Sequence, residues 1–162
     1  MAIEAFRGDY YPFSNMYPLE TWIKADCGED VPTSEHAYMA NRFSLYDDQL
    51  KVALARGSAA DNFSAKHGVA AKERAYELIR EGAVLIDERD VARIALMKRV
   101  VQLKLENNEH IKELLEGTGD QSIYEGNSWG DRFWGVSPVG SCQGYNNLGQ
   151  ILMSLRQEFR ED

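Results

Sequence analysis

The stretch between Asp87 and Asn107 constrains the fold more than any other part of this sequence. Its apolar residues recur every three or four positions, which places them along one side of a long helix. The members of this stripe are Val91, Ile94, Met97, Val101 and Leu105. A long helix with one apolar side needs partners to cover that side, so we expect a largely helical core.

Further helices are predicted from the same periodicity on both sides of this segment. Gly57 and Gly82 each follow a periodic stretch, in the position where glycine commonly ends a helix. The additional predicted helices cover residues 33–43, 47–56, 68–80, 109–116 and about 147–159.

Strand signals are short and lie mainly near the two ends of the chain. Alternation of apolar and polar residues or β-branched content predicts strands at 3–7, 21–25, 121–125 and 133–137. Residues 10–18 hold two prolines and several aromatic side chains, which predicts an irregular loop. We therefore expect an α+β fold: a mainly α-helical single domain over residues 1–162, with a small β-sheet.

Composition narrows the class of function. The chain has 162 residues and a net charge of −8, which excludes a broad, sequence-independent grip on nucleic acid but leaves room for one basic pocket. Two cysteines are too few for a disulfide scaffold or a zinc site. The first residues lack the apolar segment of a signal peptide, and no apolar run approaches transmembrane length. We expect a cytoplasmic protein with no cofactor, no metal and no membrane partner.

The segment TSEHAYMANRF at 33–43 carries the first candidate site. Thr33 or Ser34 can cap the helix, which places Glu35 in the first turn, where the helix dipole favours an ionised carboxylate. The residues that share its helix face are Tyr38, Met39 and Arg42. A carboxylate, an aromatic ring and a guanidinium on one face suit a polar organic ligand. The alternative is that Glu35 is a surface residue that only supports the helix start.

Two carboxylates beside aromatic residues fit the cleavage of a glycosidic bond. Glu35 and Asp131 are the two candidates, if the fold brings them together. One carboxylate can activate water or stabilise an oxocarbenium-like transition state, while the other protonates or orients the leaving group. The rings of Tyr38 and Trp134 would hold a flat base or a sugar.

Other chemistries have weaker support. Cys142 lacks a recognisable histidine partner, so a cysteine nucleophile is unsupported. His36 directly follows Glu35 and therefore points to another side of the helix, as a capping or core histidine would. The glycines of segment 117–120 fit either a turn at a phosphate or a simple helix stop.

Six segments in the same order resemble the YbiA/NADAR family, and the resemblance covers nearly the whole chain. They are FSNMYP at 13–18, SEHAYMANRF at 34–43, LLEGTGD at 114–120, an acidic Glu125 after a short strand, DRFWG at 131–135 and GYNNLGQILMSLR at 144–156. The segment LLEGTGD has one inserted glycine relative to the family pattern.

The resemblance implies a YbiA-like fold and an N-glycosidase that acts on a ribose phosphate derivative. Two reactions are associated with the family. One splits phosphoribosylamino-pyrimidine intermediates of riboflavin biosynthesis, and the other removes ADP-ribose from guanine in DNA. The implied partners are a small nucleotide or ADP-ribose-type substrate, or ADP-ribosylated single-stranded DNA, with the oligomeric state left open.

The motif matches also extend the list of site residues. Glu35 and Asp131 would form the catalytic pair. Arg7 and Arg42 are candidates for phosphate binding. The complete set of candidate substrate-binding residues is Asn15, Ser14, Tyr38, Trp134, Arg7, Arg42, Gly119, Glu125 and Asn146.

One departure from the family pattern bears on specificity. The family often has a tryptophan before the long helix, and Arg89 holds that place here. If that tryptophan stacks on the substrate's base, substrate preference in this chain differs from that of its relatives. The alternative function is a non-catalytic module that binds ADP-ribose or a related nucleotide.

Overall fold

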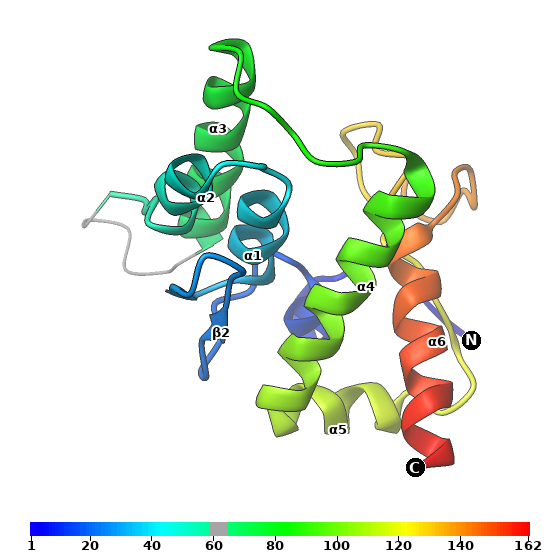
Figure 1. Cartoon of the computed structure of the whole chain (residues 1–162). Coiled ribbons are helices and arrows are strands. Elements are labelled where there is room, and N and C mark those ends of the chain that lie inside the picture. Colours follow the sequence, from blue (N-terminus) through cyan, green and yellow to red (C-terminus); the bar gives the residue numbers. More distant parts are fainter. Residues whose placement is uncertain (59–64) are drawn as a thin grey trace. The chain divides into compact units, whose positions relative to one another are not determined.

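The computed structural model describes residues 1–58 and 65–162 (Figure 1). Its elements are mainly helices with very short strands, so the fold is α+β and mainly helical, as predicted. In chain order they are β1 (Ala2–Ile3), the 3₁₀ helix η1 (Gly8–Phe13), β2 (Ile23–Lys24), β3 (Asp30–Val31), α1 (Ser34–Asn41), α2 (Tyr46–Ala53), α3 (Ala65–Arg80), α4 (Asp90–Asn107), α5 (Glu109–Gly117), β4 (Ser122–Ile123) and α6 (Asn147–Glu161).

The chain divides into two compact units. The terminal unit joins Met1–Ser14 to Glu109–Asp162, and the central unit is the continuous stretch Asn15–Asn108. The candidate site residues are therefore distributed over both units, with Glu35 in the central unit and Asp131 in the terminal unit.

The central unit is built around α1. Every residue of α1 is buried, and this helix packs against α2, α3 and α4. The antiparallel pair β2–β3, in which Ile23 lies opposite Val31, covers another part of it. Burial on all sides explains why α1 has little of the one-sided polarity of a surface helix.

The terminal unit combines α5, α6 and η1 with the parallel pair β1–β4. Ala2 lies opposite Ser122 and Ile3 opposite Ile123. The pairing extends past the strands, because the backbone N–H of Tyr124 donates to the carbonyl of Ile3 at 2.8 Å. The N-terminus is thereby tied to the segment that leads into the second candidate site.

The predicted helices all exist, but the strand prediction was only partly correct. The structure has two two-stranded pairs where one small sheet was expected. Segment 133–137 is not a strand: only an isolated bridge joins Val136 to Gly126. Segment 10–18 was predicted to be irregular, yet its first part belongs to η1, with Pro12 inside the 3₁₀ turn. A 3₁₀ turn tolerates this proline because few of its N–H groups need internal partners.

The apolar stripes were correct in the middle of helices and wrong near their ends. Met97, Val101 and Leu105 of α4 are buried, whereas Val91 in its first turn is 69% exposed. Periodicity predicts which side of a helix faces the core. It does not predict how far along the helix the neighbouring elements extend.

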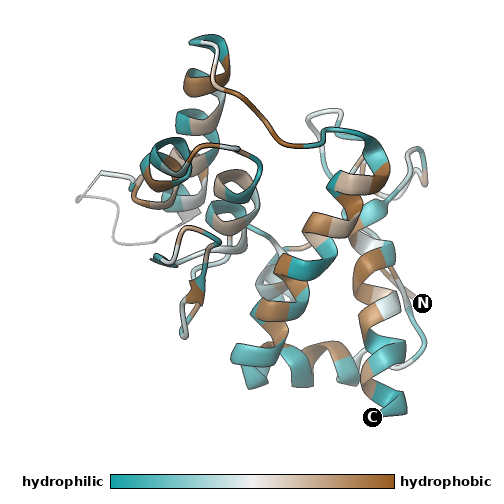
Figure 2. Cartoon of the chain, viewed as in Figure 1, coloured by the Kyte–Doolittle hydropathy of each residue, from teal (hydrophilic) through white to brown (hydrophobic). Residues whose placement is uncertain are grey.

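Hydrophobic and hydrophilic residues interleave along α4 and α6, as expected for helices that are covered on one side (Figure 2). The buried residues of α6 include Leu148, Ile151, Leu152 and Leu155. In the described part of the chain, no helix combines the length and the apolar character that crossing a bilayer requires.

Candidate functional site

Glu35 lies where the sequence predicts, in the first turn of α1, and it is buried. Thr33 is the N-cap, and its side chain accepts the backbone N–H of His36 at 3.1 Å. Glu35 is only 7% exposed, which corrects the alternative that it is a simple surface residue. A nearly buried carboxylate at the positive end of a helix is held ready to oppose a developing positive charge.

Asn15 fixes the start of this helix from the neighbouring loop. Its carbonyl accepts the backbone N–H of Glu35 at 3.0 Å, and its side-chain Oδ1 accepts the Ser34 hydroxyl at 2.9 Å. Its Nδ2 lies 3.5 Å from Sδ of Met97 on α4. The structure thus brings the predicted residues Asn15 and Glu35 together, with Asn15 positioning the backbone of Glu35.

Tyr38 and Arg42 form a cation–π pair on the same helix. The Arg42 guanidinium lies 5.7 Å from the centre of the Tyr38 ring, and both side chains are buried. Arg42 also bonds Glu88, with Nη2 2.5 Å from Oε1. Because Glu88 already neutralises it, Arg42 is a weaker phosphate candidate than the sequence indicates. Burial raises the pKa of Tyr38.

Two residues of α4 in the central unit were not predicted as site residues. Arg93 donates from Nε to the Tyr38 hydroxyl at 3.4 Å. Lys104 is 1% exposed, and burial lowers the pKa of its amine to about 7. Strongly shifted pKa values gather at functional sites, so Lys104 becomes a candidate residue of the central unit. The sequence could have indicated this burial, because Lys104 follows Met97 and Val101 at helical spacing and so lies on the apolar side of α4.

His36 is the core histidine that the sequence favoured. It is fully buried between the hydroxyl of Thr33 and the carbonyl of Ala55, each 2.7 Å from one ring nitrogen. Burial lowers the pKa of His36 from 6.5 to about 4. Its neutral ring joins the start of α1 to Ala55, just after α2.

We expect this histidine to make the fold sensitive to acid. The folded state takes up its proton only near pH 4, whereas the unfolded chain takes it up near pH 6.5. The contribution of His36 to the free energy of unfolding is therefore complete above pH 6.5. It is lost as the pH falls to about 4, by about 3 kcal/mol in total. NMR titration of the imidazole shifts should give His36 a midpoint near 4. A midpoint at its ordinary value would contradict this account.

In the terminal unit, Asp131 caps a turn. Its Oδ1 accepts the backbone N–H groups of Phe133 and Trp134, each at 3.0 Å. The rings of these two residues meet edge to face, with centres 4.7 Å apart. Asp131 therefore fixes the backbone that carries Trp134, and the two predicted residues lie together.

Two buried asparagines connect this turn to its surroundings. Asn127 accepts the N–H of Asp131 at Oδ1 (3.0 Å) and donates from Nδ2 to the Asp131 carbonyl (2.8 Å). Asn146 donates from Nδ2 to the Ile123 carbonyl at 2.8 Å and accepts the N–H of Glu125 at 2.9 Å. Asn127 was not predicted, because a buried asparagine that holds a turn has no distinctive sequence signal. Asn146, a predicted binding residue, has both side-chain polar atoms engaged in the fold.

The N-terminus of α6 is bonded to the same turn. The N–H groups of Asn146, Asn147 and Leu148 donate to the carbonyls of three consecutive residues, at 3.0–3.2 Å. Those acceptors are Gly135, Phe133 and Trp134. This helix end therefore orients the turn at Asp131, and these three N–H groups are used by the fold.

Three other predicted residues lie at the ends of short helices. Arg7 is exposed before η1, and Ser14 ends the same 3₁₀ helix. Gly119 has a positive φ of 61° in the turn after α5, and its carbonyl accepts a bond from Arg160. Thr118 beside it is buried and bonds the Leu115 carbonyl at 2.6 Å, which favours the helix stop over a phosphate turn.

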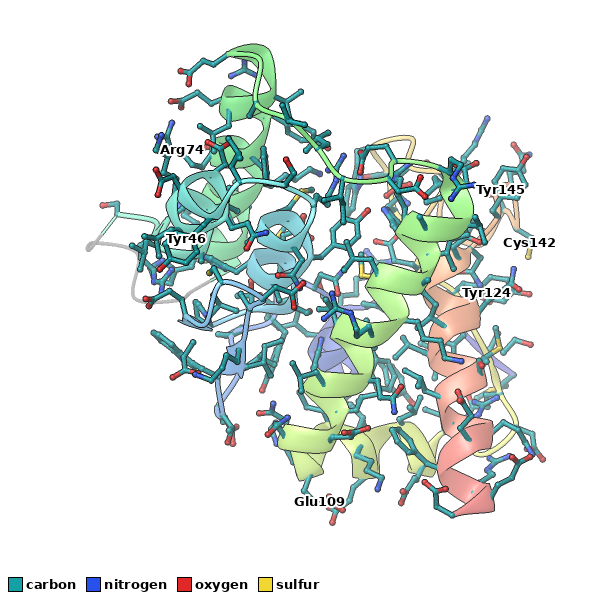
Figure 3. All side chains as sticks on the ribbon, in the orientation of Figure 1. Tyr46, Arg74, Glu109, Tyr124, Cys142 and Tyr145 are labelled. Atoms are coloured by element: carbon teal, nitrogen blue, oxygen red, sulfur yellow. The ribbon has the colours of Figure 1, made fainter. Side chains whose placement is uncertain are left out.

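Cys142 is an exposed free cysteine in the terminal unit. A hydrogen bond with Cys142 raises the pKa of Tyr124, and both residues are labelled beside α6 in Figure 3. Neither Tyr124 nor the adjacent Tyr145 is a base that would activate a thiol. The structure therefore adds no support to cysteine chemistry. Among the described residues, His, Cys, Asp and Glu side chains do not gather into a metal-binding group.

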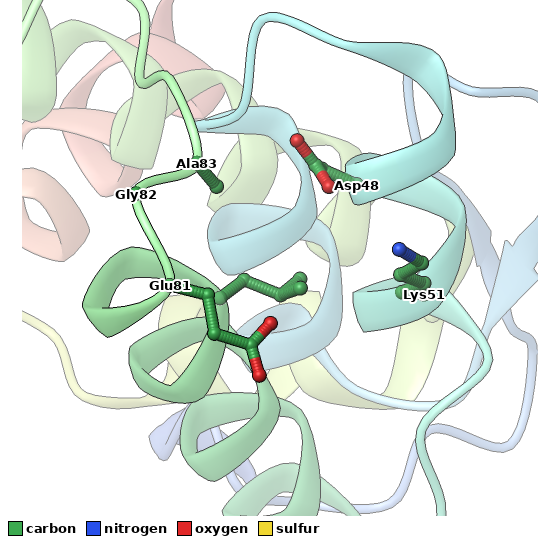
Figure 4. Close-up of a pocket in the computed structure, with 6 residues that line it drawn as sticks. Asp48, Lys51, Glu81, Gly82 and Ala83 are labelled. Carbon is green, nitrogen blue, oxygen red and sulfur yellow. The ribbon is translucent and has the colours of Figure 1, made fainter.

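A pocket of about 220 Å³ lies in the central unit, away from these residues. It is lined by Asp48, Lys51, Leu78, Glu81, Gly82 and Ala83. Figure 4 shows Asp48 and Lys51 on α2 facing the end of α3. Sites for small organic molecules are mostly apolar with a few polar groups. This pocket is lined largely by charged groups and does not fit a base and a ribose.

Comparison with known proteins agrees with the motif pattern. A family model described as the NADAR domain matches residues 4–160. The N-glycosidase Npun_R5314 of Nostoc punctiforme is 32% identical over 152 residues, covering 93% of this chain and 86% of that protein. N-glycosidase YbiA of Escherichia coli is 30% identical, covering 93% of this chain and 82% of the relative.

A longer relative and a solved structure complete the comparison. The riboflavin biosynthesis protein VVA0006 of Vibrio vulnificus is 32% identical over 91% of this chain, which spans only 35% of that protein. The NMR structure of E. coli YbiA superposes with a TM-score of 0.75 at 23% identity, covering 99% of this chain and 84% of that one. The fold is thus that of YbiA, and the chain belongs to the NADAR domain family.

Proposed function

We propose that this chain is an N-glycosidase that hydrolyses the N-glycosidic bond of a ribose phosphate derivative. The observation that carries the proposal is Glu35, a carboxylate that is 7% exposed at the start of a buried helix, next to Tyr38 and Arg42. The names of the Nostoc and E. coli relatives support the reaction type, and that of the Vibrio relative supports a link to riboflavin intermediates.

Glu35 would act on the positive charge that develops at the sugar. Breaking the bond between the anomeric carbon and nitrogen leaves an oxocarbenium-like centre, which an ionised carboxylate stabilises. The dipole of α1 favours the ionised form of Glu35, and Asn15 holds its backbone in place. Tyr38 is 1% exposed and has Arg42 over its ring, so it would support Arg42 and the start of α1 rather than stack on the substrate, which corrects the stacking role expected from the sequence.

Asp131 would be the second member of the catalytic pair, with an electrostatic and orienting role. Its Oδ1 already bonds the backbone of Phe133 and Trp134, so the carboxylate is held in place and Trp134 lies beside it. Trp134 would then pack against the base, as aromatic side chains commonly do with flat ligands.

The substrate is one of two ribosyl compounds, and product analysis separates them. The protein should be incubated with a phosphoribosylamino-pyrimidine and, in parallel, with single-stranded DNA that carries ADP-ribosylated guanine. Ribose 5-phosphate from the first would assign a role in clearing metabolites, and ADP-ribose from the second would assign a role in DNA repair. The net charge of −8 makes a broad duplex surface unsuitable, but an unpaired modified base needs only a local pocket.

A further inference from the structure

The pocket at the end of α3 has walls that the fold holds in place. Gly82 ends this helix with a φ of 94°, and the backbone N–H of Ala83 donates to the carbonyl of Leu78 at 3.0 Å. On the opposite wall, the side chain of Gln49 on α2 donates to the carbonyl of Phe43 at 2.7 Å. Because the walls are already ordered, a ligand pays little to organise them.

Three charged side chains surround this space without neutralising one another. Asp48 and Lys51 come from α2 and Glu81 from the end of α3, and Figure 4 shows their side chains around one opening. Within residues 1–58 and 65–162, neither an ion pair nor a side-chain hydrogen bond involves any of the three. Two carboxylates outnumber the single amine, and the C-terminal end of α3 adds partial negative charge. The pocket therefore favours a cationic group.

An exposed apolar strip begins where the pocket ends. The backbone N–H of Ser44 donates to the carbonyl of Val84 at 3.0 Å, so the start of α2 and the segment after α3 lie side by side. Val84 directly follows Ala83 of the pocket. The side chains of this apolar strip are between 43% and 57% exposed, and they are Leu45, Tyr46, Val84 and Ile86. Neighbouring exposed apolar residues are a common feature of interaction surfaces.

The same segment presents a backbone edge that suits an extended chain. Phe43 and Leu85 form an isolated antiparallel bridge, and the N–H of Ile86 donates to the carbonyl of Arg42 at 2.8 Å. Successive residues of a strand direct their backbone groups to opposite edges, so the N–H and C=O of Leu85 point away from Phe43. Among the described residues, no hydrogen bond reaches these two groups. An extended peptide can pair with such an edge.

We propose that this surface of the central unit binds an extended segment of another protein in which a lysine or arginine is flanked by apolar residues. The basic side chain enters the pocket between Asp48 and Glu81, and the flanking residues cover the apolar strip. A second copy of this chain is a poorer occupant, because two chains of net charge −8 repel each other. The proposed N-glycosidase reaction uses neither carboxylate of this pocket, so the two proposals are tested separately.

The test uses a short fluorescein-labelled peptide with a central arginine between leucines. Its control is the same peptide with citrulline, which has nearly the shape of arginine but no charge. We expect saturable binding of the arginine peptide in fluorescence anisotropy, at least about fivefold tighter than that of the citrulline peptide. The double variant Asp48→Asn/Glu81→Gln should lose this preference, whereas the exposed control Glu113→Gln should keep it. Val84→Ser should weaken the binding of both peptides alike.

Several outcomes would overturn the inference. They are the absence of saturable binding to the unchanged protein, equal affinity for the two peptides, and an undiminished preference for arginine in a folded Asp48→Asn/Glu81→Gln protein. Free arginine that binds as tightly as the peptide would identify a small-molecule site instead. Sedimentation of the protein alone should show a monomer at this surface. A dimer that Val84→Ser dissociates would assign the surface to a second copy and contradict the proposal.

Discussion

Glu35→Gln is expected to lower kcat for the hydrolysed substrate by about a hundredfold or more. Glutamine keeps the size and shape of the side chain, so the helix start and its bond from the Glu35 backbone N–H to Asn15 should remain. What is lost is the negative charge that would stabilise the oxocarbenium-like transition state. KM should change much less than kcat, because the charge is needed most in the transition state.

A matched substitution controls for the general loss of a negative charge. Glu73 lies on the exposed side of α3 in the same unit, and Glu73→Gln should leave kcat unchanged. Steady-state kinetics on all three proteins, with circular dichroism to check folding, gives the comparison. A Glu35→Gln protein that is folded and retains the kcat of the unchanged protein would remove Glu35 from the mechanism.

Asn146→Ala should have the largest effect on stability among the site substitutions. It removes two hydrogen bonds to buried backbone groups, the carbonyl of Ile123 and the N–H of Glu125. Each unsatisfied group costs about 1–3 kcal/mol, so the free energy of unfolding should fall by about 3 kcal/mol. Asn146 also has a φ of 52°, which asparagine tolerates better than alanine. Tm should fall by about 10 °C in a chain of this size.

The neighbouring residue provides the control for this prediction. Asn147 enters the same turn through its backbone N–H, which donates to Phe133, so Asn147→Ala keeps that bond. Urea unfolding of both variants measures the difference directly. An Asn146→Ala protein as stable as Asn147→Ala would show that the side-chain bonds of Asn146 are not what joins β4 to α6.

Local sequence signals predicted the helices well because each helix depends on residues close in sequence. Thr33 caps α1 as predicted, and the apolar spacing of Met97, Val101 and Leu105 gives the buried side of α4. The strands were harder, because β1 pairs with β4 across more than a hundred residues of sequence. Segment 133–137 has strand-like composition, but its carbonyls are used by the first turn of α6.

The site shows the same division between local and long-range information. The shared face of Glu35, Tyr38 and Arg42 follows from helical spacing, so the sequence indicates it directly. That Glu88 pairs with Arg42, 46 positions away in the sequence, could not be predicted from either local segment. The orientation of Glu125 likewise depends on Asn127, on Asn146 and on the absence of a side chain at position 135. These contacts join residues that are far apart in the sequence, so they can be seen only in the folded structure.

The most direct test of the central claim is a count of product molecules released per protein molecule. The protein should be incubated with excess phosphoribosylamino-pyrimidine, and separately with ADP-ribosylated single-stranded DNA, and the free base and sugar phosphate measured by mass spectrometry. We expect many equivalents of both products from at least one substrate, and a loss of about a hundredfold in Glu35→Gln. No product from either substrate, with ADP-ribose still bound in calorimetry, would contradict the claim and identify a binding module.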